Sequence, residues 1–295
     1  MRAKYYLAAI TAFTIWGLFS FVLKPLDTYP SPDILFYRIF LCVILMLVTN
    51  LTIRRRQLKE TRDLLMQKPL KTRRNLALLT VLSSILLAAN WFFFIYVMNQ
   101  ISVKAASFSY LICPLITTVF AFIILKEKLS PLQWLSILIS TAACVLLSFN
   151  NVADLGYSLL VAGSYALYLV LQKKFDGIDK FVLLSTQLVI TSVFLLPFYP
   201  VYSGPIPTEP IFWTYIAIIA VCFTILPMLL NLFALKGITS STLGILMYIN
   251  PIIGFMLAAF YYKEEISATQ IVAYSLIAVA IAIFNIGSYL KMRRA

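Results

Sequence analysis

The sequence predicts an all-α membrane protein with ten transmembrane helices, built as two inverted repeats of five helices with both termini in the cytoplasm. Composition is the first reason, because 62% of the 295 residues are apolar and only 12% are charged, about half the charged share of a soluble domain. The second reason is that the apolar residues come in blocks of about twenty, the length a helix needs to cross the hydrocarbon core. The third is an internal repeat.

Charged residues, prolines and polar clusters divide the chain into ten predicted spans. Most connections are only a few residues long, so neighbouring spans are expected to pack as antiparallel hairpins. The first block is too long for the core of a signal peptide and has no small-residue cleavage motif, so we expect it to remain as a helix. The predicted spans are residues 5–24, 33–53, 75–98, 104–125, 131–149, 155–172, 181–199, 211–235, 240–262 and 267–289.

The basic residues predict the orientation of these spans. With a cytoplasmic N-terminus, 20 of the 24 Lys and Arg residues fall in cytoplasmic segments, three fall outside (Lys24, Lys104 and Lys263), and Arg38 lies within a span. This bias follows the positive-inside rule. It also explains the net charge of +13 without nucleic acid, which needs one contiguous basic face.

Nine of the cytoplasmic basic residues lie in the connection RRRQLKETRDLLMQKPLKTRRN (54–75). We expect this connection to lie on anionic headgroups as a topology anchor, because each basic residue near the surface contributes about 1 kcal/mol. A regulatory or partner-binding role is the alternative.

The internal repeat appears when the chain is shifted by 137 residues. SYLICPLITTVFAFIILKEKLSPLQW (109–134) then aligns with LMYINPIIGFMLAAFYYKEEISATQI (246–271). The polar and proline matches carry the alignment: Pro114 with Pro251, Lys126 with Lys263, Glu127 with Glu264, Ser130 with Ser267 and Gln133 with Gln270. A weaker match at a shift of 149 pairs Trp16 with Tyr165 and Lys24 with Lys173.

The repeat predicts two halves, residues 1–150 and 151–295. Each half holds five spans, and because five is odd the second half enters the membrane from the opposite side to the first. Inverted repeats of this kind are typical of secondary transporters, whose substrate site lies near the midplane between the halves. Duplication without transport is the alternative.

Missing residue types exclude several chemistries. The chain has no histidine, which excludes imidazole relays and His-based catalytic or metal sites. Its four cysteines all fall within apolar blocks without metal-ligand spacing. No phosphate-binding glycine loop is present. We therefore expect no metal, no cofactor, no direct ATP drive and no enzyme activity, and leave facilitated diffusion, exchange and proton coupling through loop-end carboxylates open.

Three stretches resemble a known family. NWFFFIYVMNQISVKAASFSYLICPLITTVFAFIILKEKLSPLQW (90–134), STLGILMYINPIIGFMLAAFYYKEEIS (241–267) and YYLAAITAFTIWGLFSFVLK (5–24) resemble RarD-type permeases of the EamA branch of the drug/metabolite transporter superfamily. The resemblance covers nearly the whole chain and is weakest in the sixth and seventh spans. It implies ten transmembrane helices, a central cavity, alternating access, and export or exchange of metabolites or drugs across the bacterial inner membrane.

Arg38 is the only charged residue well inside a span. Charges within membranes are costly and usually face a cavity, so we expect Arg38 to attract an anionic group of a substrate; snorkelling to the headgroups is the alternative. Asn90, Trp91 and Asn231 place polar groups at depth, where interhelical hydrogen bonding and substrate contact are equally compatible with the sequence.

The remaining candidates flank two prolines. Tyr110 shares a helical face with Pro114, Tyr248 shares one with Pro251, and Asn250 directly precedes Pro251. A proline within a helix leaves a carbonyl unbonded, so we expect hinges at Pro114 and Pro251, with static kinks as the alternative. Trp16 joins the predicted substrate site through the family resemblance.

The sequence therefore predicts a multi-pass inner-membrane transporter with two partners: the lipid bilayer and a small anionic, zwitterionic or aromatic substrate. A monomer is sufficient, and a dimer is compatible with the pattern. A membrane-embedded enzyme would need a cluster of acids, bases or ligands, and a receptor or scaffold would not need opposed halves; these are the competing functions.

Overall fold

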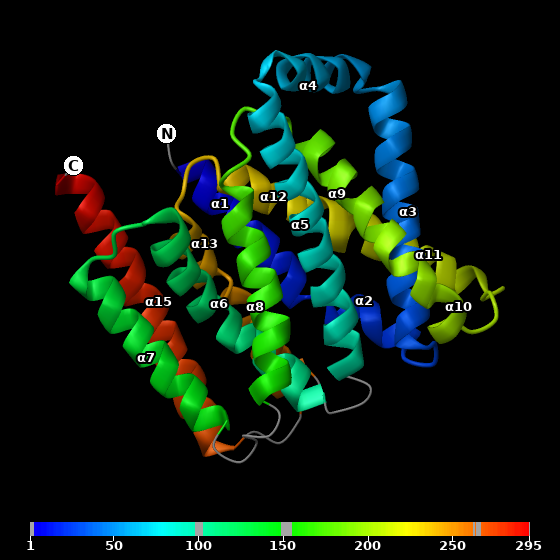
Figure 1. Ribbon diagram of the computed structural model, residues 1–295. Helices are drawn as coiled ribbons and strands as arrows, with labels where there is room; N and C mark the ends of the chain where they lie inside the picture. The colour runs from blue at the N-terminus through cyan, green and yellow to red at the C-terminus, as the bar shows by residue number, and fades with distance from the viewer. Residues whose placement is uncertain (1–2, 98–102, 149–154, 262, 264–266, 295) are drawn as a thin grey trace.

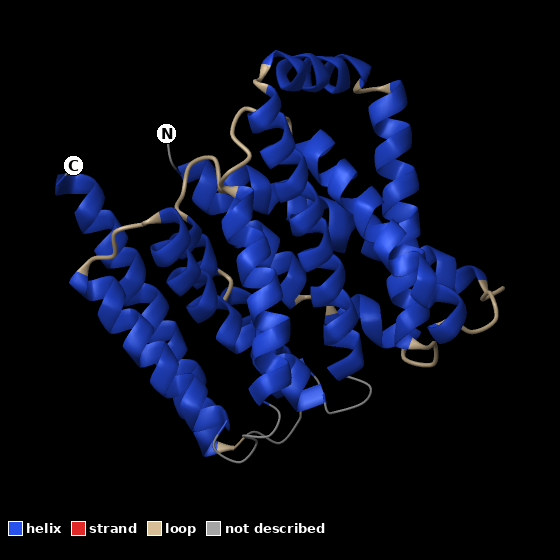
Figure 2. Ribbon diagram, viewed as in Figure 1, coloured by secondary structure: helices blue, strands red, loops and turns tan. Residues whose placement is uncertain are grey.

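The computed structural model describes residues 3–97, 103–148, 155–261, 263 and 267–294. Every regular element among them is helical (Figure 2), which confirms the prediction of an all-α chain. In order, the elements are α1 (Ala3–Gly17), α2 (Ser20–Leu23), η1 (Lys24–Leu26), α3 (Ser31–Thr52), α4 (Arg55–Gln67), α5 (Leu70–Tyr96), α6 (Val103–Leu125), α7 (Pro131–Ser148), α8 (Leu155–Gln172), α9 (Lys180–Leu195), η4 (Leu196–Phe198), α10 (Tyr199–Tyr202), α11 (Pro210–Ala220), η5 (Val221–Ile225), α12 (Leu226–Ala234), α13 (Ser240–Leu246), α14 (Ile249–Met256), η6 (Leu257–Tyr261) and α15 (Ala268–Arg294).

Seven helical stretches of the described chain are long and apolar enough to cross a membrane, and three more apolar helices are shorter. Each of the ten predicted spans overlaps one of these ten stretches. Prolines set several of the starts: α7 begins at Pro131 and α11 at Pro210, because the first helical position needs no backbone donor. The apolar surface of the bundle, with Leu7 and Phe260 more than half exposed, is what a lipid environment would cover.

The basic connection 54–75 contains a helix that the sequence analysis did not predict. Figure 1 shows α4 lying across the shared end of α3 and α5. Leu58, Thr61 and Leu65 are spaced at i, i+3 and i+7 and form one face, on which Thr61 is buried. Helices of this amphipathic type lie along membrane surfaces. We call this end of the molecule the α4 end.

Two predicted spans are interrupted by a turn, and a third contains a π-helical segment. The first breaks at Leu18–Phe19 between α1 and α2, and the ninth breaks at Met247–Tyr248 between α13 and α14. The eighth stays helical but contains the π-helical segment η5 (Val221–Ile225). Such π segments are frequent at functional sites.

The helices pack in pairs that join distant parts of the chain. Helix α1 packs against α12 and α14, α6 packs against α8 and α13, and α5 packs against α8 and α9. Helix α3 packs against α9 and α11, and α7 packs along α15 at one side of the bundle (Figure 1). The largest buried cluster lies at the centre and takes Phe13 from α1, Cys113 from α6 and Ala166 from α8.

Glycines permit the closest of these approaches. A Cβ at Gly17 would lie 2.7 Å from the Cβ of Ile253, and one at Gly244 would lie 2.9 Å from Cγ2 of Thr117. Small residues at helix crossings are characteristic of membrane bundles. They bring α1 against α14, and α13 against α6.

Candidate functional site

Arg38 lies on α3 with an environment unusual for a guanidinium group. Its carbon Cζ is 5.3 Å from the centre of the Trp91 ring on α5, a cation–π contact. Its Nε is shielded from solvent and has no hydrogen-bond partner. Within the described part of the chain Arg38 forms no ion pair, and Tyr110 on α6 lies within electrostatic range of it. The predicted residues Arg38, Trp91 and Tyr110 therefore come together.

Asp33, the nearest acid along the chain, is committed elsewhere. Its carboxylate accepts hydrogen bonds from the Ser203 hydroxyl and from the Gly204 backbone N–H, the latter at 3.1 Å. The side chain is only 1% exposed. It therefore fixes the loop after α10 and leaves the charge of Arg38 without a carboxylate.

Trp16, Tyr165 and Asn231 form the second group of polar and aromatic side chains. The rings of Trp16 and Tyr165 meet edge to face with centroids 6.3 Å apart. The Trp16 indole N–H donates to the Phe223 carbonyl in η5 at 2.8 Å, so the π segment supplies its acceptor. Asn231 lies next to the Tyr165 hydroxyl, yet neither amide atom of this buried side chain has a hydrogen bond of normal geometry. An unpaired buried amide is costly.

The two groups are neighbours, because Tyr165 also lies within electrostatic range of Tyr110. We call Arg38, Trp91, Tyr110, Tyr165 and Asn231 the interior polar cluster. It combines one uncompensated cation, one unpaired amide and three aromatic rings. Such a set can hold a small molecule through an anionic group, a second polar group and an apolar face.

Asn90 forms an interhelical hydrogen bond, which is one of the two roles that the sequence left open for it. Its Nδ2 donates to the Val161 carbonyl on α8 at 2.9 Å, and its Oδ1 has no partner. On the same face of α8, Cys113 donates through sulfur to the Ala162 carbonyl. These contacts hold α5 and α6 against α8.

Tyr248 belongs to a different buried group from the residues of the interior polar cluster. Tyr248 is fully buried in a separate apolar group with Leu111, Cys144 and Phe284, where α7 and α15 pack. Asn250 is half-buried at the start of α14. The substrate roles predicted for both residues stay predictions.

The two prolines differ in their local structure. Pro251 follows the Met247–Tyr248 interruption, whereas Pro114 lies inside the continuous helix α6. Around Pro114, the Thr118 hydroxyl donates to the Pro114 carbonyl at 2.9 Å and the Thr117 hydroxyl to the Cys113 carbonyl at 2.8 Å. Helix α6 is therefore continuous through its proline, whereas the ninth span is broken three residues before its own.

Two charged side chains at the α4 end hold the connection between α12 and α13. Glu127 accepts hydrogen bonds from the Ser240 N–H at 2.8 Å, the Ser241 N–H at 3.0 Å and the Ser241 hydroxyl at 2.6 Å. Lys173 donates to the carbonyls of Leu235 and Ile238. Burial lowers the pKa of Lys173, and the nearby Glu127 carboxylate opposes that shift. Glu264, predicted to match Glu127, lies outside the described residues.

A buried hydrogen-bond chain was missed in the sequence analysis. The Tyr168 hydroxyl donates to Gln187 Oε1 at 3.3 Å, and Gln187 Nε2 donates to Gln172 Oε1 at 3.2 Å. The signal for Gln187 was present in the sequence, because it is an amide inside an apolar block, as Asn90 is. The chain joins α8 to α9.

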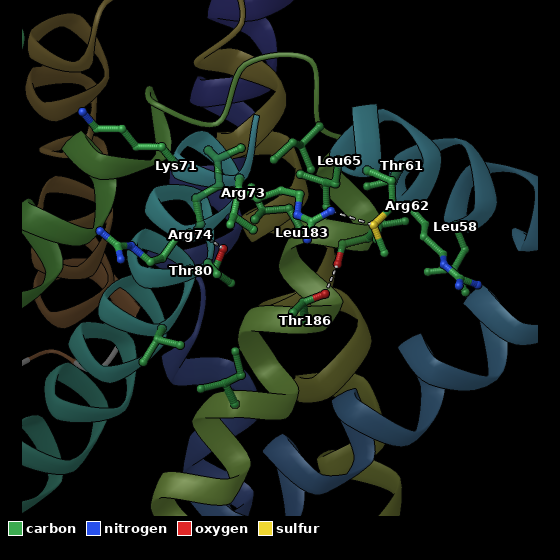
Figure 3. A pocket seen from close by; sticks show the side chains of 18 residues that line it. Leu58, Thr61, Arg62, Leu65, Lys71, Arg73, Arg74, Thr80, Leu183 and Thr186 are labelled. Carbon is green, nitrogen blue, oxygen red and sulfur yellow. Dashed lines mark hydrogen bonds between the residues drawn. The ribbon is translucent and has the colours of Figure 1, made fainter. Parts of the chain in front are cut away.

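A cavity of about 1010 Å³ lies at the α4 end among α4, α5 and α9. Figure 3 shows Arg62, Lys71, Arg73 and Arg74 around it, together with Leu and Thr side chains. Its lining shares no residue with the interior polar cluster. The sequence analysis did not predict this cavity.

A bundle of apolar helices with polar groups buried in its interior defines a multi-pass membrane protein. The chain belongs to the EamA-like transporter family, whose model matches residues 3–149 and 155–286. This membership and the names of its relatives support a membrane transporter.

The relatives are similar over nearly their full lengths. An uncharacterized transporter, YojE, from Bacillus subtilis is 30% identical over 296 residues, covering 96% of this chain and 94% of the relative. Protein RarD from Escherichia coli is 28% identical, covering 98% and 96%. A crystal structure of a protein with 15% identity superposes with a TM-score of 0.75, covering 97% of this chain and 98% of that one, which shows a shared fold.

Proposed function

We propose that the protein is a secondary transporter of the bacterial inner membrane that moves small organic anions or zwitterions by alternating access, through export or exchange. Residues 1–150 and 151–295 form its two halves, which oppose each other across the bilayer with both termini in the cytoplasm. The transporter names of several relatives favour this function over a membrane-embedded enzyme.

Matching local structure supports the two halves. Lys126 and Lys263, aligned by the 137-residue shift, are the two non-glycine residues of the described chain with positive φ, and both have φ of 54°. The following helices begin with the same reciprocal cap: Gln133 accepts from the Ser130 N–H at 2.8 Å, and Gln270 accepts from the Ser267 N–H at 2.9 Å. Equal backbone and equal capping at aligned positions are expected of a duplicated unit.

The helix pairing supports the same division. When the halves are exchanged, the α6–α8 contact corresponds to the α14–α1 contact, and the α5–α8 contact corresponds to the α12–α1 contact. All four contacts are present. The α6–α13 and α7–α15 pairs convert into themselves. Figure 1 shows α1 starting at the α4 end and α8 starting at the opposite end, as opposed halves require.

The observation that carries the substrate proposal is that Arg38 has no counter-charge among the described residues. A guanidinium inside a membrane span without a counter-charge is costly; Arg38 is half-buried there, and the Trp91 ring is its described contact. A carboxylate or phosphate of a substrate would supply the missing charge, while Asn231 would bind a second polar group and Tyr110, Tyr165 and Trp91 the apolar part. The interruption before Pro251 supplies one flexible joint of the cycle, and Pro114 inside α6 supplies the second hinge.

Arg38→Gln and Arg38→Lys test this role as a matched pair. The full chain is reconstituted in proteoliposomes, and counterflow and binding are measured over a panel of radiolabelled carboxylates, phosphates, zwitterions and neutral aromatic compounds. For anionic substrates we expect Arg38→Gln to weaken binding about 10- to 100-fold, as for a lost charged hydrogen bond of about 1.5–3 kcal/mol, with partial recovery in Arg38→Lys.

The neutral compounds are the internal control, because they do not need the guanidinium. Unchanged anion binding in both variants, in protein that elutes as a single species and unfolds as the wild type does, would exclude Arg38 as the anion site. Equal loss for anions and neutral compounds would show a structural role only.

A further inference from the structure

We propose that the cavity among α4, α5 and α9 is a specific binding site for an anionic phospholipid, with the headgroup phosphate held by basic residues of α4 and α5 and an acyl chain in the groove below. This site is separate from the interior polar cluster. The occupant follows from the charge, the lining and the position of the cavity.

The rim of the cavity is cationic. Arg62 of α4 and Lys71, Arg73 and Arg74 of α5 all line it. The ion pairs recorded in the described chain are Arg54–Asp179 and Arg56–Glu60, so none of the four rim residues is neutralised by an acid there. Arg73 instead places Nη1 3.1 Å from the Met66 sulfur; Figure 3 shows it in the middle of the site, with Lys71 and Arg74 to one side and Arg62 to the other.

The walls below the rim are apolar. They are built from Leu65, Leu76, Val182, Leu183 and Ile190. The polar groups of the walls are satisfied within their own helices: the Thr80 hydroxyl donates to the Leu76 carbonyl and the Thr186 hydroxyl to the Val182 carbonyl. An acyl chain can therefore pack against the apolar side chains of the groove without leaving the Thr80 and Thr186 hydroxyls unpaired.

The size and position of the cavity select a lipid over a soluble ligand. Its volume of about 1010 Å³ is at the upper end for small-molecule pockets. The lining continues outward through Leu70, 74% exposed, and Val81, 38% exposed, onto the face of the bundle that a bilayer would cover, so a lipid can enter from the side. Basic pockets at this depth attract anionic headgroups.

Lys71→Gln/Arg74→Gln tests the headgroup contacts, and both side chains are exposed, so the fold should tolerate the change. Lys59→Gln/Lys68→Gln is the matched control, because it removes the same charge from the same segment at residues that do not line the cavity. Either variant leaves most of the basic residues of the segment in place, so topology is preserved.

Binding of phosphatidylglycerol and of phosphatidylcholine with identical acyl chains is measured on the purified full chain by native mass spectrometry and by the shift in thermal unfolding. We expect selective binding of phosphatidylglycerol. We expect it to weaken about 30-fold in Lys71→Gln/Arg74→Gln, which corresponds to about 1 kcal/mol per residue, and to change little in the control pair.

Ala77→Trp tests the groove, since Ala77 lines it and an indole would fill it without altering the charge. We expect phosphatidylglycerol binding to fall at least tenfold, with glycerol phosphate and inorganic phosphate competing weakly or not at all. Equal binding of both lipids, equal loss in both charge pairs, full competition by inorganic phosphate, or unchanged binding in Ala77→Trp would each overturn the proposal.

Discussion

Gly244→Ala is expected to destabilise the fold at the crossing of α13 and α6. The added Cβ would lie 2.9 Å from Cγ2 and 3.0 Å from Cβ of Thr117, and 3.3 Å from the Pro114 carbonyl oxygen. Thr117 Cβ and the Pro114 carbonyl oxygen cannot move unless the backbone shifts. The Thr117 side chain is also held in place, because its hydroxyl donates to the Cys113 carbonyl. Overpacking of this kind costs about 1–3 kcal/mol, against about 1 kcal/mol gained from replacing glycine in a helix.

Gly254→Ala is the matched control in the same span, because a Cβ there meets nothing within 4 Å. The helix gain then stands alone, so unfolding of Gly254→Ala in detergent should occur at or above the wild-type midpoint, while Gly244→Ala falls below it. Thr117→Ser removes the nearest clashing atom and should restore part of the loss in the double variant, a coupling typical of residues in contact. Identical midpoints for the two alanine variants would refute the close crossing of α13 and α6.

Two further predictions concern single contacts. Glu127→Ala should raise amide hydrogen exchange at Ser240 and Ser241, at the start of α13, at least tenfold. The carboxylate accepts both N–H groups, and such charged hydrogen bonds contribute about 1.5–3 kcal/mol. Unchanged exchange would contradict this capping role. Trp16→Phe should lower the unfolding midpoint, since it leaves the Phe223 carbonyl of η5 without the indole donor. Trp213→Phe is the control: Trp213 donates to the Pro207 carbonyl and is 39% exposed, so the effect should be smaller. An equal loss in both variants would refute a special contribution of the Trp16–Phe223 bond.

The apolar blocks were sufficient to predict the helices, because hydrocarbon thickness and internal backbone hydrogen bonding leave few alternatives. Helix α4 was missed for the opposite reason: its apolar face is narrow and lies among many charges, and such a pattern forms a helix only when it packs on something. A hinge was predicted at Pro251, and the ninth span is interrupted just before this residue, at Met247–Tyr248. The π segment η5 has no comparable sequence signal.

The candidate site was predicted in part. Arg38 stood out by its charge alone. Trp16 was placed in the site through the family resemblance, and it contacts its weak repeat partner Tyr165. Tyr248 was grouped with Tyr110 because each precedes a proline, but the 137-residue shift aligns Tyr248 with Leu111, and these two residues share the cluster against α7 and α15. One residue of offset turns a helical side chain by about 100°, so strict alignment would have separated the two tyrosines.

Arg38 and Arg54 make an internal comparison that bears on function. Both guanidinium groups lie over an aromatic ring, at 5.3 Å from Trp91 and 5.0 Å from Phe181. Arg54 also contacts the Asp179 carboxylate at 2.9 Å, in a setting close to solvent. Arg38 lies inside a span and forms no ion pair with any described residue. A cation–π contact contributes about 0.5–2 kcal/mol, less than the several kcal/mol that desolvation of an ion costs. The fold thus neutralises Arg54, which water already stabilises, and supplies no carboxylate to Arg38, which lies deeper. This arrangement fits a counter-charge that arrives and leaves with each substrate.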